Sequence, residues 1–351
     1  TLGWGVYVAG KERGERDSSL SSVSEELDFQ SDLKFCELVG SSLRNLLLVK
    51  KLERQQASLR MFFSPVVMKA ISVLDSEDVL HPRKCNLSVL FCDLRGFSKT
   101  SEEMSDDLLE LLARVSEALG ITTSNILDFG GVIGDFHGDS AMGFWGWPIP
   151  PSSSEQNAVS AVKAAISIHQ HVDSHARLRR IGRKGKDDRG FQFGIGVASG
   201  ESVAGKIGTR DQVKVTAFGP VVNLASRLEG MTNWLNSKIL IDSVTLEALK
   251  TDPVFSQEIV VRGMGNFQPF GMAGSFDVFQ VCAANELTVE ELSHSKSLLA
   301  WFRSGEWMRL EKELAILDST DALRRFLEKF MRQHAGTPPQ RWHGTIQMQT
   351  K

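Results

Sequence analysis

Between residues 86 and 282, the chain alternates short apolar runs with longer stretches whose apolar residues recur every three or four positions. The short runs predict strands and the longer stretches predict amphipathic helices. The order β-α-β-β-α-β predicts an α+β fold, a ferredoxin-like βαββαβ sandwich with added strands. The predicted strands are Leu87–Cys92, Val132–Ile133, Ala141–Trp147, Phe191–Ala198, Ser202–Ile207, Val213–Phe218, Ile259–Phe267 and Ser275–Val281, and the predicted helices are 101–127, 158–177 and 220–228.

The helix over residues 101–127 has an expected apolar face, and this face would pack on the sheet. Its members are Leu108, Leu109, Leu111, Leu112, Val115 and Leu119.

The residues before this region follow another pattern. Residues 2–9 are apolar and predict a strand, and residues 10–27 are Ser- and Glu-rich and predict a loop. From Asp28 to about Leu59 the spacing is helical. This helix either packs on its own domain or pairs with a second copy as a signalling helix, and the short apolar repeat leaves both interpretations open. Residues 62–74 predict a further helix with Pro65 in its first turn.

The residues after the core region are charged and helical from 285 to 334, and the last sixteen predict a flexible tail. The net charge of −3 gives no electrostatic case for binding nucleic acid. The four cysteines are scattered, which is typical of reduced thiols in the cytoplasm. No apolar run approaches the roughly 20 residues of a membrane span. Because the first residue is Thr1, we expect a fragment of a longer protein.

The first stretch with chemical interest reads DFGGVIGDFHGDSAMGFWGWP, from Asp128 to Pro148. Its glycines allow a tight reversal and its flanks suit strands, so it predicts a β-hairpin with Asp139 at the tip. An aspartate after glycine is also ordinary turn chemistry, and this stretch alone does not decide between a structural and a functional acid.

A second stretch, SVLFCDLRGFS, places another acid at the end of a strand. The apolar run ends on Asp93, and the following turn contains Gly96, Phe97 and Ser98. Carboxylate oxygens bind hard divalent cations, and the N–H groups of such a turn bind phosphate. Together with Asp139, Asp93 predicts a site for metal ions and a nucleotide polyphosphate.

Four motifs in order resemble the class III adenylate/guanylate cyclase catalytic domain. They are LFCDLRGFS, GGVIGDFHGDSAMGFWGWP, FGIGVASGESVAGKIG and VTAFGPVVNLASRLEG. The resemblance covers about residues 86–282 and implies conversion of ATP or GTP to a 3′,5′-cyclic monophosphate and pyrophosphate. Residues 1–27 resemble the end of a GAF-type sensor, residues 28–85 would be transducer helices, and residues 283–351 a helical extension with the tail.

The resemblance also implies a homodimer with shared active sites, as the output of an upstream sensor in the same chain. Asp93 and Asp139 of one protomer would hold two Mg²⁺ or Mn²⁺ ions, with the Leu94 carbonyl as a further ligand. Asn223 and Arg227 of the other protomer would stabilise the transition state. They lie four residues apart, so one helix face presents both.

The sequence departs from the family pattern at three positions. Asp135 stands where many adenylate cyclases have a base-reading lysine, Pro220 where an acid is usual, and Phe270 where a polyphosphate-binding lysine often lies. A carboxylate suits the guanine N1–H, whereas the partner position, Thr216, either donates or accepts. The chemistry of Asp135 therefore leans to GTP, while the family pattern favours ATP.

Two other functions remain open at this point. The two missing lysines allow a catalytically degenerate module that binds nucleotide or dimerises to report a sensor state. A metal-dependent phosphotransferase on a similar sandwich would explain both acids, although it would not explain the VNLASRLE helix.

Overall fold

The computed structural model describes residues 21–59, 63–74, 77–97, 101–102, 105–149, 153–182, 192–252, 255–269 and 274–348. The chain divides into two compact units between Phe63 and Ser64. The predicted strand over residues 2–9 and most of the predicted loop lie outside the described residues.

The first unit contains one long helix, α1 (Ser21–Leu59). The helix begins at Ser21 and not at Asp28, so the end of the predicted loop is helical. Glu25 and Glu26 are good helix formers, and the sequence analysis gave more weight to the serines around them. Large apolar side chains of α1 are exposed, namely Leu33, Phe35, Leu38, Leu43, Leu46, Leu47, Leu48, Val49 and Leu52.

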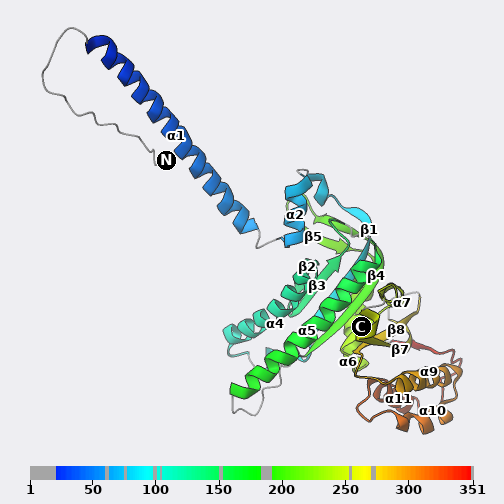
Figure 1. Ribbon diagram of the computed structural model, residues 1–351. Coiled ribbons are helices and arrows are strands. Elements are labelled where there is room, and N and C mark those ends of the chain that lie inside the picture. Colours follow the sequence, from blue (N-terminus) through cyan, green and yellow to red (C-terminus); the bar gives the residue numbers. More distant parts are fainter. Residues whose placement is uncertain are drawn as a thin grey trace. The chain divides into compact units, whose positions relative to one another are not determined.

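The second unit is built on one sheet, which has nine strands within the described residues and confirms the α+β sandwich (Figure 1). The strand order is β2-β3-β1-β4-β6-β8-β7-β9, and β5 pairs with β4 outside this path. The strands are β1 (Arg83–Leu94), β2 (Val132–His137), β3 (Ser140–Trp145), β4 (Phe193–Gly208), β5 (Val213–Phe218), β6 (Ile239–Ile241), β7 (Ile259–Gln268), β8 (Phe276–Ala283) and β9 (Thr345–Gln347).

Strand β4 corrects one prediction. The two paired strands expected on either side of residues 199–201 are one continuous strand. No reversal forms at Gly200, because this residue pairs with Leu87 in a ladder that runs without a break from Arg83 to Leu94. The Ser-Gly-Glu sequence is compatible with a turn, and only the long neighbouring strand β1 shows that the backbone stays extended.

Helices pack on this sheet and close the core. Ile126 of α4 and Ile168 of α5 join Leu90, Ile195 and Val197 of the central strands in one buried cluster. Before them, α2 begins at Pro65 as predicted. The helices are α2 (Pro65–Leu74), η1 (Glu77–Leu80), α4 (Leu108–Asp128), α5 (Glu155–Gly182), α6 (Pro220–Trp234), α7 (Ser243–Leu249) and α8 (Phe255–Glu258).

Helix α4 begins seven residues later than predicted. The Asp107 carboxylate caps it by accepting a hydrogen bond from the Glu110 N–H at 3.1 Å. The buried stripe then includes Leu111 and Val115, as expected. Leu108, Leu109 and Leu112, which were expected in the core, are exposed. Leu109 lies opposite the buried stripe, Leu112 lies at its edge, and Leu108 is the first residue of the helix.

The C-terminal residues form a helical layer at one end of the second unit (Figure 1). Its helices are α9 (Val289–Ser304), α10 (Trp307–Glu313), η2 (Leu314–Ile316) and α11 (Ala322–Gln333). The flexible tail predicted after them is wrong over most of its length, because Thr345–Gln347 forms β9 and pairs in parallel with β7. The prolines and glycines of this segment favoured the prediction of a flexible tail, but its apolar side chains Trp342 and Ile346 pack on the rest of the unit. Ile346 is 1% exposed.

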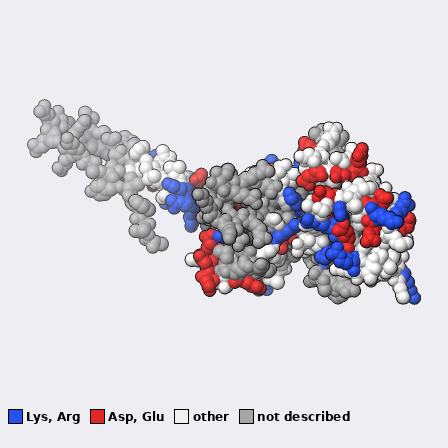
Figure 2. Space-filling view, turned by 90° about the horizontal axis from the view of Figure 1, so that it is seen from below, with Lys and Arg blue, Asp and Glu red and all other residues white. Residues whose placement is uncertain are grey.

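The surface carries charges of both signs. Over the described part of the face in Figure 2, Lys and Arg side chains are interspersed with Asp and Glu side chains. This face therefore has no broad basic patch of the kind that binds nucleic acid. Within the described residues, none of the helices combines the length and the apolar composition needed to span a bilayer.

Candidate active site

Two carboxyl groups meet at one end of β1. Asp93 is the next-to-last residue of β1, and Asp139 lies in the turn between β2 and β3. Because β1 pairs antiparallel with β3, with Cys92 opposite Ala141, the strand end and the hairpin turn are neighbours. The two carboxyl groups are close enough for Asp139 to raise the pKa of Asp93. The structure thus brings together the two acids that the sequence singled out as metal ligands.

Burial disfavours the ionised forms of both acids, and the charge of Asp139 acts in the same direction on Asp93. Burial, followed by the charge and hydrogen bond of Asp139, raises the pKa of Asp93 to about 6. Burial also raises the pKa of Asp139. A hydrogen bond from the Leu94 backbone acts in the opposite direction on both carboxyl groups. Acids held close together in this way favour a bound cation, which neutralises both.

A third carboxyl group, which the sequence analysis missed, belongs to Glu229 of α6. Burial, followed by the charge of Asp93, raises the pKa of Glu229 to about 8. No three His, Cys, Asp or Glu side chains in the described chain are grouped so as to hold a metal ion. The oxygen donors of Asp93 and Asp139 nevertheless fit Mg²⁺ or Mn²⁺, since such ions are often held by one or two carboxylates beside substrate phosphates.

Arg95 connects the turn after β1 to the far end of α6. Its Nη2 donates hydrogen bonds to the Ser237 carbonyl and, at 3.2 Å, to the Thr232 carbonyl. The charge of Arg95 also opposes the increase in the pKa of Glu229. Sequence reasoning missed Arg95, although it stands inside the LFCDLRGFS motif. The next residue, Gly96, has a φ of 75°, which favours glycine.

The predicted phosphate turn is described only in part. Phe97 packs its side chain against the hydrophobic core, which anchors the turn. Ser98 lies outside the described residues.

Helix α6 lies close to the sheet because β4 has glycines beneath it. A Cβ placed on Gly196 would lie 2.2 Å from the Glu229 backbone nitrogen, and one on Gly194 would lie 2.2 Å from the Thr232 hydroxyl oxygen. Ala225 and Leu228 of α6 are fully buried. The glycines of the FGIGVASG motif therefore permit the close approach of this helix.

The other side of α6 faces a cavity of about 1620 Å³. Asn223 and Arg227 both line it, so one helix face presents the pair as the four-residue spacing predicts. Neither Asp93 nor Asp139 lines this cavity. The structure therefore places the acid pair and the Asn/Arg pair in separate surroundings within one chain.

A model of the adenylate and guanylate cyclase catalytic domain matches residues 79–274. The chain belongs to this family. The adenylate cyclase, terminal-differentiation specific, of Dictyostelium discoideum is 29% identical over 226 residues, which cover 63% of this chain and 10% of that protein. The adenylate cyclase of Anabaena cylindrica is 29% identical over 180 residues, covering 51% of this chain and 34% of the relative. The match thus spans between 10% and 34% of the length of these curated relatives.

A solved structure of a bacterial light-regulated adenylyl cyclase agrees with the fold. It superposes with a TM-score of 0.55 at 18% identity, and the match covers 72% of this chain and 66% of that one. The cyclase domain therefore has both the sequence pattern and the architecture of its family.

In this cyclase domain, Asp135 lies within β2 and pairs with a lysine that the sequence analysis did not consider. Lys214 of β5 places its Nζ 2.9 Å and 3.1 Å from the two Asp135 carboxylate oxygens. Although burial acts in the other direction, the hydrogen bond and charge of Lys214 hold the pKa of Asp135 below its usual value. Lys214 and Thr216 are two residues apart and share one face of β5. Asp135 therefore lies beside the strand face that carries Thr216.

Phe270, where the family pattern often has a lysine, lies outside the described residues.

Proposed function

We propose that this chain is a nucleotidyl cyclase that converts ATP or GTP to the 3′,5′-cyclic monophosphate and pyrophosphate. The observation that carries the proposal is the meeting of Asp93 and Asp139 at the end of β1, in a chain of the cyclase family. Two neighbouring acids whose ionised forms are disfavoured form a poor structural pair, whereas they form a good site for divalent cations beside a polyphosphate.

Asp93 and Asp139 would hold two divalent ions, Mg²⁺ or Mn²⁺, with the Leu94 carbonyl as a further ligand. When bound, such ions lower the pKa of the ribose 3′-hydroxyl and neutralise the leaving pyrophosphate. The backbone N–H groups of Gly96, Phe97 and Ser98 would bind the phosphates. Arg95 contributes indirectly, because its hydrogen bonds to the Thr232 and Ser237 carbonyls hold this turn against the end of α6.

Asn223 and Arg227 would act on a nucleotide whose metal ions are held by a second copy of the chain. Their separation from Asp93 and Asp139 within one chain supports a site completed in a homodimer. The Arg227 guanidinium has fixed donors for the charge that grows on the phosphoryl oxygens. Asn223 would orient the ribose so that its 3′-oxygen faces the α-phosphorus.

The base would lie against Asp135 and Thr216, where Lys214 is now a third candidate. Because Lys214 neutralises Asp135, the site offers an acceptor and a donor side by side. A carboxylate suits the guanine N1–H, and an ammonium suits the adenine N1. The pair is therefore compatible with either base, and its orientation in the dimer decides the preference.

Helix α1 would connect the cyclase domain to an upstream sensor. Its apolar side chains, such as Leu43 and Leu46, are exposed within the first unit, and pairing with the same helix of a second copy would bury them. A paired helix at the entrance of a dimeric cyclase suits signal transmission, because a change in its pairing alters the interface that completes each site.

The test is incubation of the purified chain with Mn²⁺ and each nucleoside triphosphate, with chromatography of the products. We expect a cyclic monophosphate and pyrophosphate in equal amounts from ATP or GTP. An Asp93→Ala chain prepared in the same way is the control for contaminating enzymes. If a correctly folded dimer binds nucleotide but forms no cyclic product, the chain is the degenerate signalling module and not a cyclase.

A further inference from the structure

The C-terminal end of the described chain forms one wall of the cavity that contains Asn223 and Arg227. This C-terminal wall comprises residues 333–348, and His334, Arg341 and His343 are among the side chains that line the cavity. The family match ends at residue 274, so the wall is an addition to the matched domain. A segment outside the family match thus lies beside Asn223 and Arg227, the two residues proposed to act on the transition state.

The wall is held firmly on the sheet. Strand β9 pairs with β7, and the Thr345 hydroxyl donates a hydrogen bond to Asn266 at 2.9 Å. The Trp342 indole N–H donates to the Phe302 carbonyl at 2.8 Å, so α9 fixes the middle of the wall. Together with the burial of Ile346, these contacts give Arg341 a fixed backbone next to the cavity.

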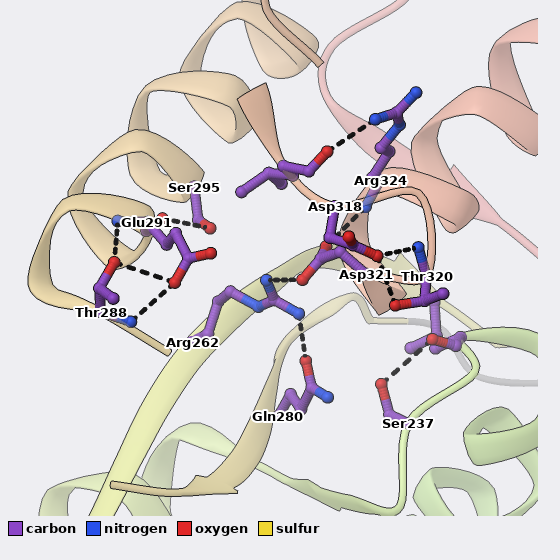
Figure 3. A network of polar contacts seen from close by, with 12 residues as sticks. Ser237, Arg262, Gln280, Thr288, Glu291, Ser295, Asp318, Thr320, Asp321 and Arg324 are labelled. Atoms are coloured by element: carbon purple, nitrogen blue, oxygen red, sulfur yellow. Dashed lines mark hydrogen bonds and ion pairs between the residues drawn. The ribbon is translucent and has the colours of Figure 1, made fainter. Parts of the chain in front are cut away.

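The helical layer that supports the wall also supports α6. Trp234, at the end of α6, packs edge-to-face on Phe326 of α11, with ring centroids 5.0 Å apart. Figure 3 shows Arg262 of β7 reaching Asp321, the residue that caps α11. The oxygen–nitrogen distance of this ion pair is 2.7 Å. Because the C-terminal helical layer contacts both α6 and the wall, packed elements hold Arg227 and Arg341 at the same cavity.

The chemistry of the cavity suits an anion. Among the described residues that line it there is no Asp or Glu, and the charged side chains are Arg227 and Arg341. The two imidazoles of His334 and His343 and several side-chain amides add hydrogen-bonding groups. The chain as a whole has a net charge of −3, so this grouping of cations does not follow from overall composition. A guanidinium binds phosphate through two parallel hydrogen bonds, which a fixed backbone favours.

We infer that Arg341 binds the triphosphate of the nucleotide in the cavity shared with Arg227. The inference rests on the proposed function and extends it, because it assigns a phosphate contact to a segment outside the matched domain. It also answers one departure from the family pattern. The position that often supplies a polyphosphate-binding lysine is Phe270 here, and Arg341 supplies a cation from another part of the chain.

The test uses inorganic tripolyphosphate as the probe and the full chain without added metal. Its dissociation constant is measured by calorimetry for wild type, Arg341→Asn and Lys329→Gln. Asparagine tolerates positive φ, and φ at Arg341 is 60°, so this variant removes the charge with little backbone strain. Lys329 is an exposed cation of α11 that does not line the cavity, and its variant is the matched control.

We expect Arg341→Asn to bind tripolyphosphate about tenfold more weakly than wild type, since a charge-assisted hydrogen bond is lost. Lys329→Gln should bind within about twofold of wild type, because a distant exposed charge is screened. Arg341→Lys, which keeps the charge, should restore part of the loss. In cyclase assays Arg341→Asn should raise KM for the nucleotide by a similar factor, with kcat changed by less.

Two results would overturn the inference. One is a wild-type chain that does not bind tripolyphosphate, and the other is equal binding by wild type and Arg341→Asn. Circular dichroism shows whether Arg341→Asn is folded. If it is not, wild type is compared with Arg341→Lys at high salt instead. Equal binding of tripolyphosphate by these two chains would then contradict a bidentate contact from the Arg341 guanidinium. A chain that binds tripolyphosphate through Arg341 but makes no cyclic product contradicts the proposed function and leaves this inference intact. If the chain forms cyclic product and Arg341→Asn leaves the KM for the nucleotide unchanged, the result contradicts this inference and leaves the proposed function intact.

Discussion

Replacing Arg262 should destabilise the second unit far more than replacing Arg303, although each arginine forms an ion pair between the sheet and the C-terminal layer. The Arg262–Asp321 pair has an N–O distance of 2.7 Å, and its side chains are 2% and 11% exposed. The Arg303–Asp277 pair has a distance of 2.8 Å, with side chains 48% and 44% exposed. The two ion pairs thus have nearly the same N–O distance and differ in how deeply their side chains are buried.

The expected magnitudes follow from the partners that each change leaves behind. Arg262→Met leaves the Asp321 carboxylate without its cation and the Gln280 amide oxygen without its donor at 2.7 Å. Breaking a buried pair from one side costs about 3–5 kcal/mol. Arg303→Met removes a solvated pair, which contributes at most about 1 kcal/mol.

The assay is urea unfolding followed by tryptophan fluorescence, because Trp234, Trp307 and Trp342 all lie in or beside the C-terminal layer. The free energy of unfolding is extrapolated to water for wild type and the two methionine variants. Asp321→Asn is a useful addition, because asparagine retains helix-capping ability while it removes the charge.

Equal and small losses in both methionine variants would refute the reasoning, since burial would then not govern the cost. A loss in Arg303→Met as large as that in Arg262→Met would refute it equally. If Arg262→Met unfolds the C-terminal layer alone, the fluorescence change should precede the loss of helical signal from the rest of the second unit.

Three further predictions concern the site. Asp93→Ala and Asp139→Ala should each lower cyclisation to background in a folded dimer, as the product assay measures, and substantial activity in either would contradict the metal assignment. Mixing Asp93→Ala with Arg227→Ala chains should restore activity in the heterodimer, which has one intact site; demonstrated chain exchange without recovery would argue against a shared site. The exchange variant Asp135→Lys/Lys214→Asp keeps the ion pair but swaps the positions of donor and acceptor, and it should change the ATP/GTP ratio of kcat/KM by about tenfold, because a polar group of the base left unpaired costs about 1–3 kcal/mol. An unchanged ratio in an active enzyme would remove this pair from base selection.

The sequence by itself determined the elements whose signals are local. The turn residues around Gly138 and the apolar flanks predicted the β2–β3 hairpin with Asp139 in its turn. The strand that ends near Asp93 and the helix that presents Asn223 and Arg227 were also predicted. Their periodicities of about two and four residues can be recognised within a single short segment. The order of these elements was enough for the α+β sandwich.

Only the tertiary structure decided the contacts between residues distant in sequence. Lys214 pairs with Asp135 across 79 positions, and the half-buried Glu229 approaches Asp93 only because α6 packs over the glycines of β4. Strand β9 likewise needs the edge of β7, without which its three residues have no partner. Hydrogen bonds between strands and burial of charge depend on which surfaces meet, and no periodicity within a single segment records that.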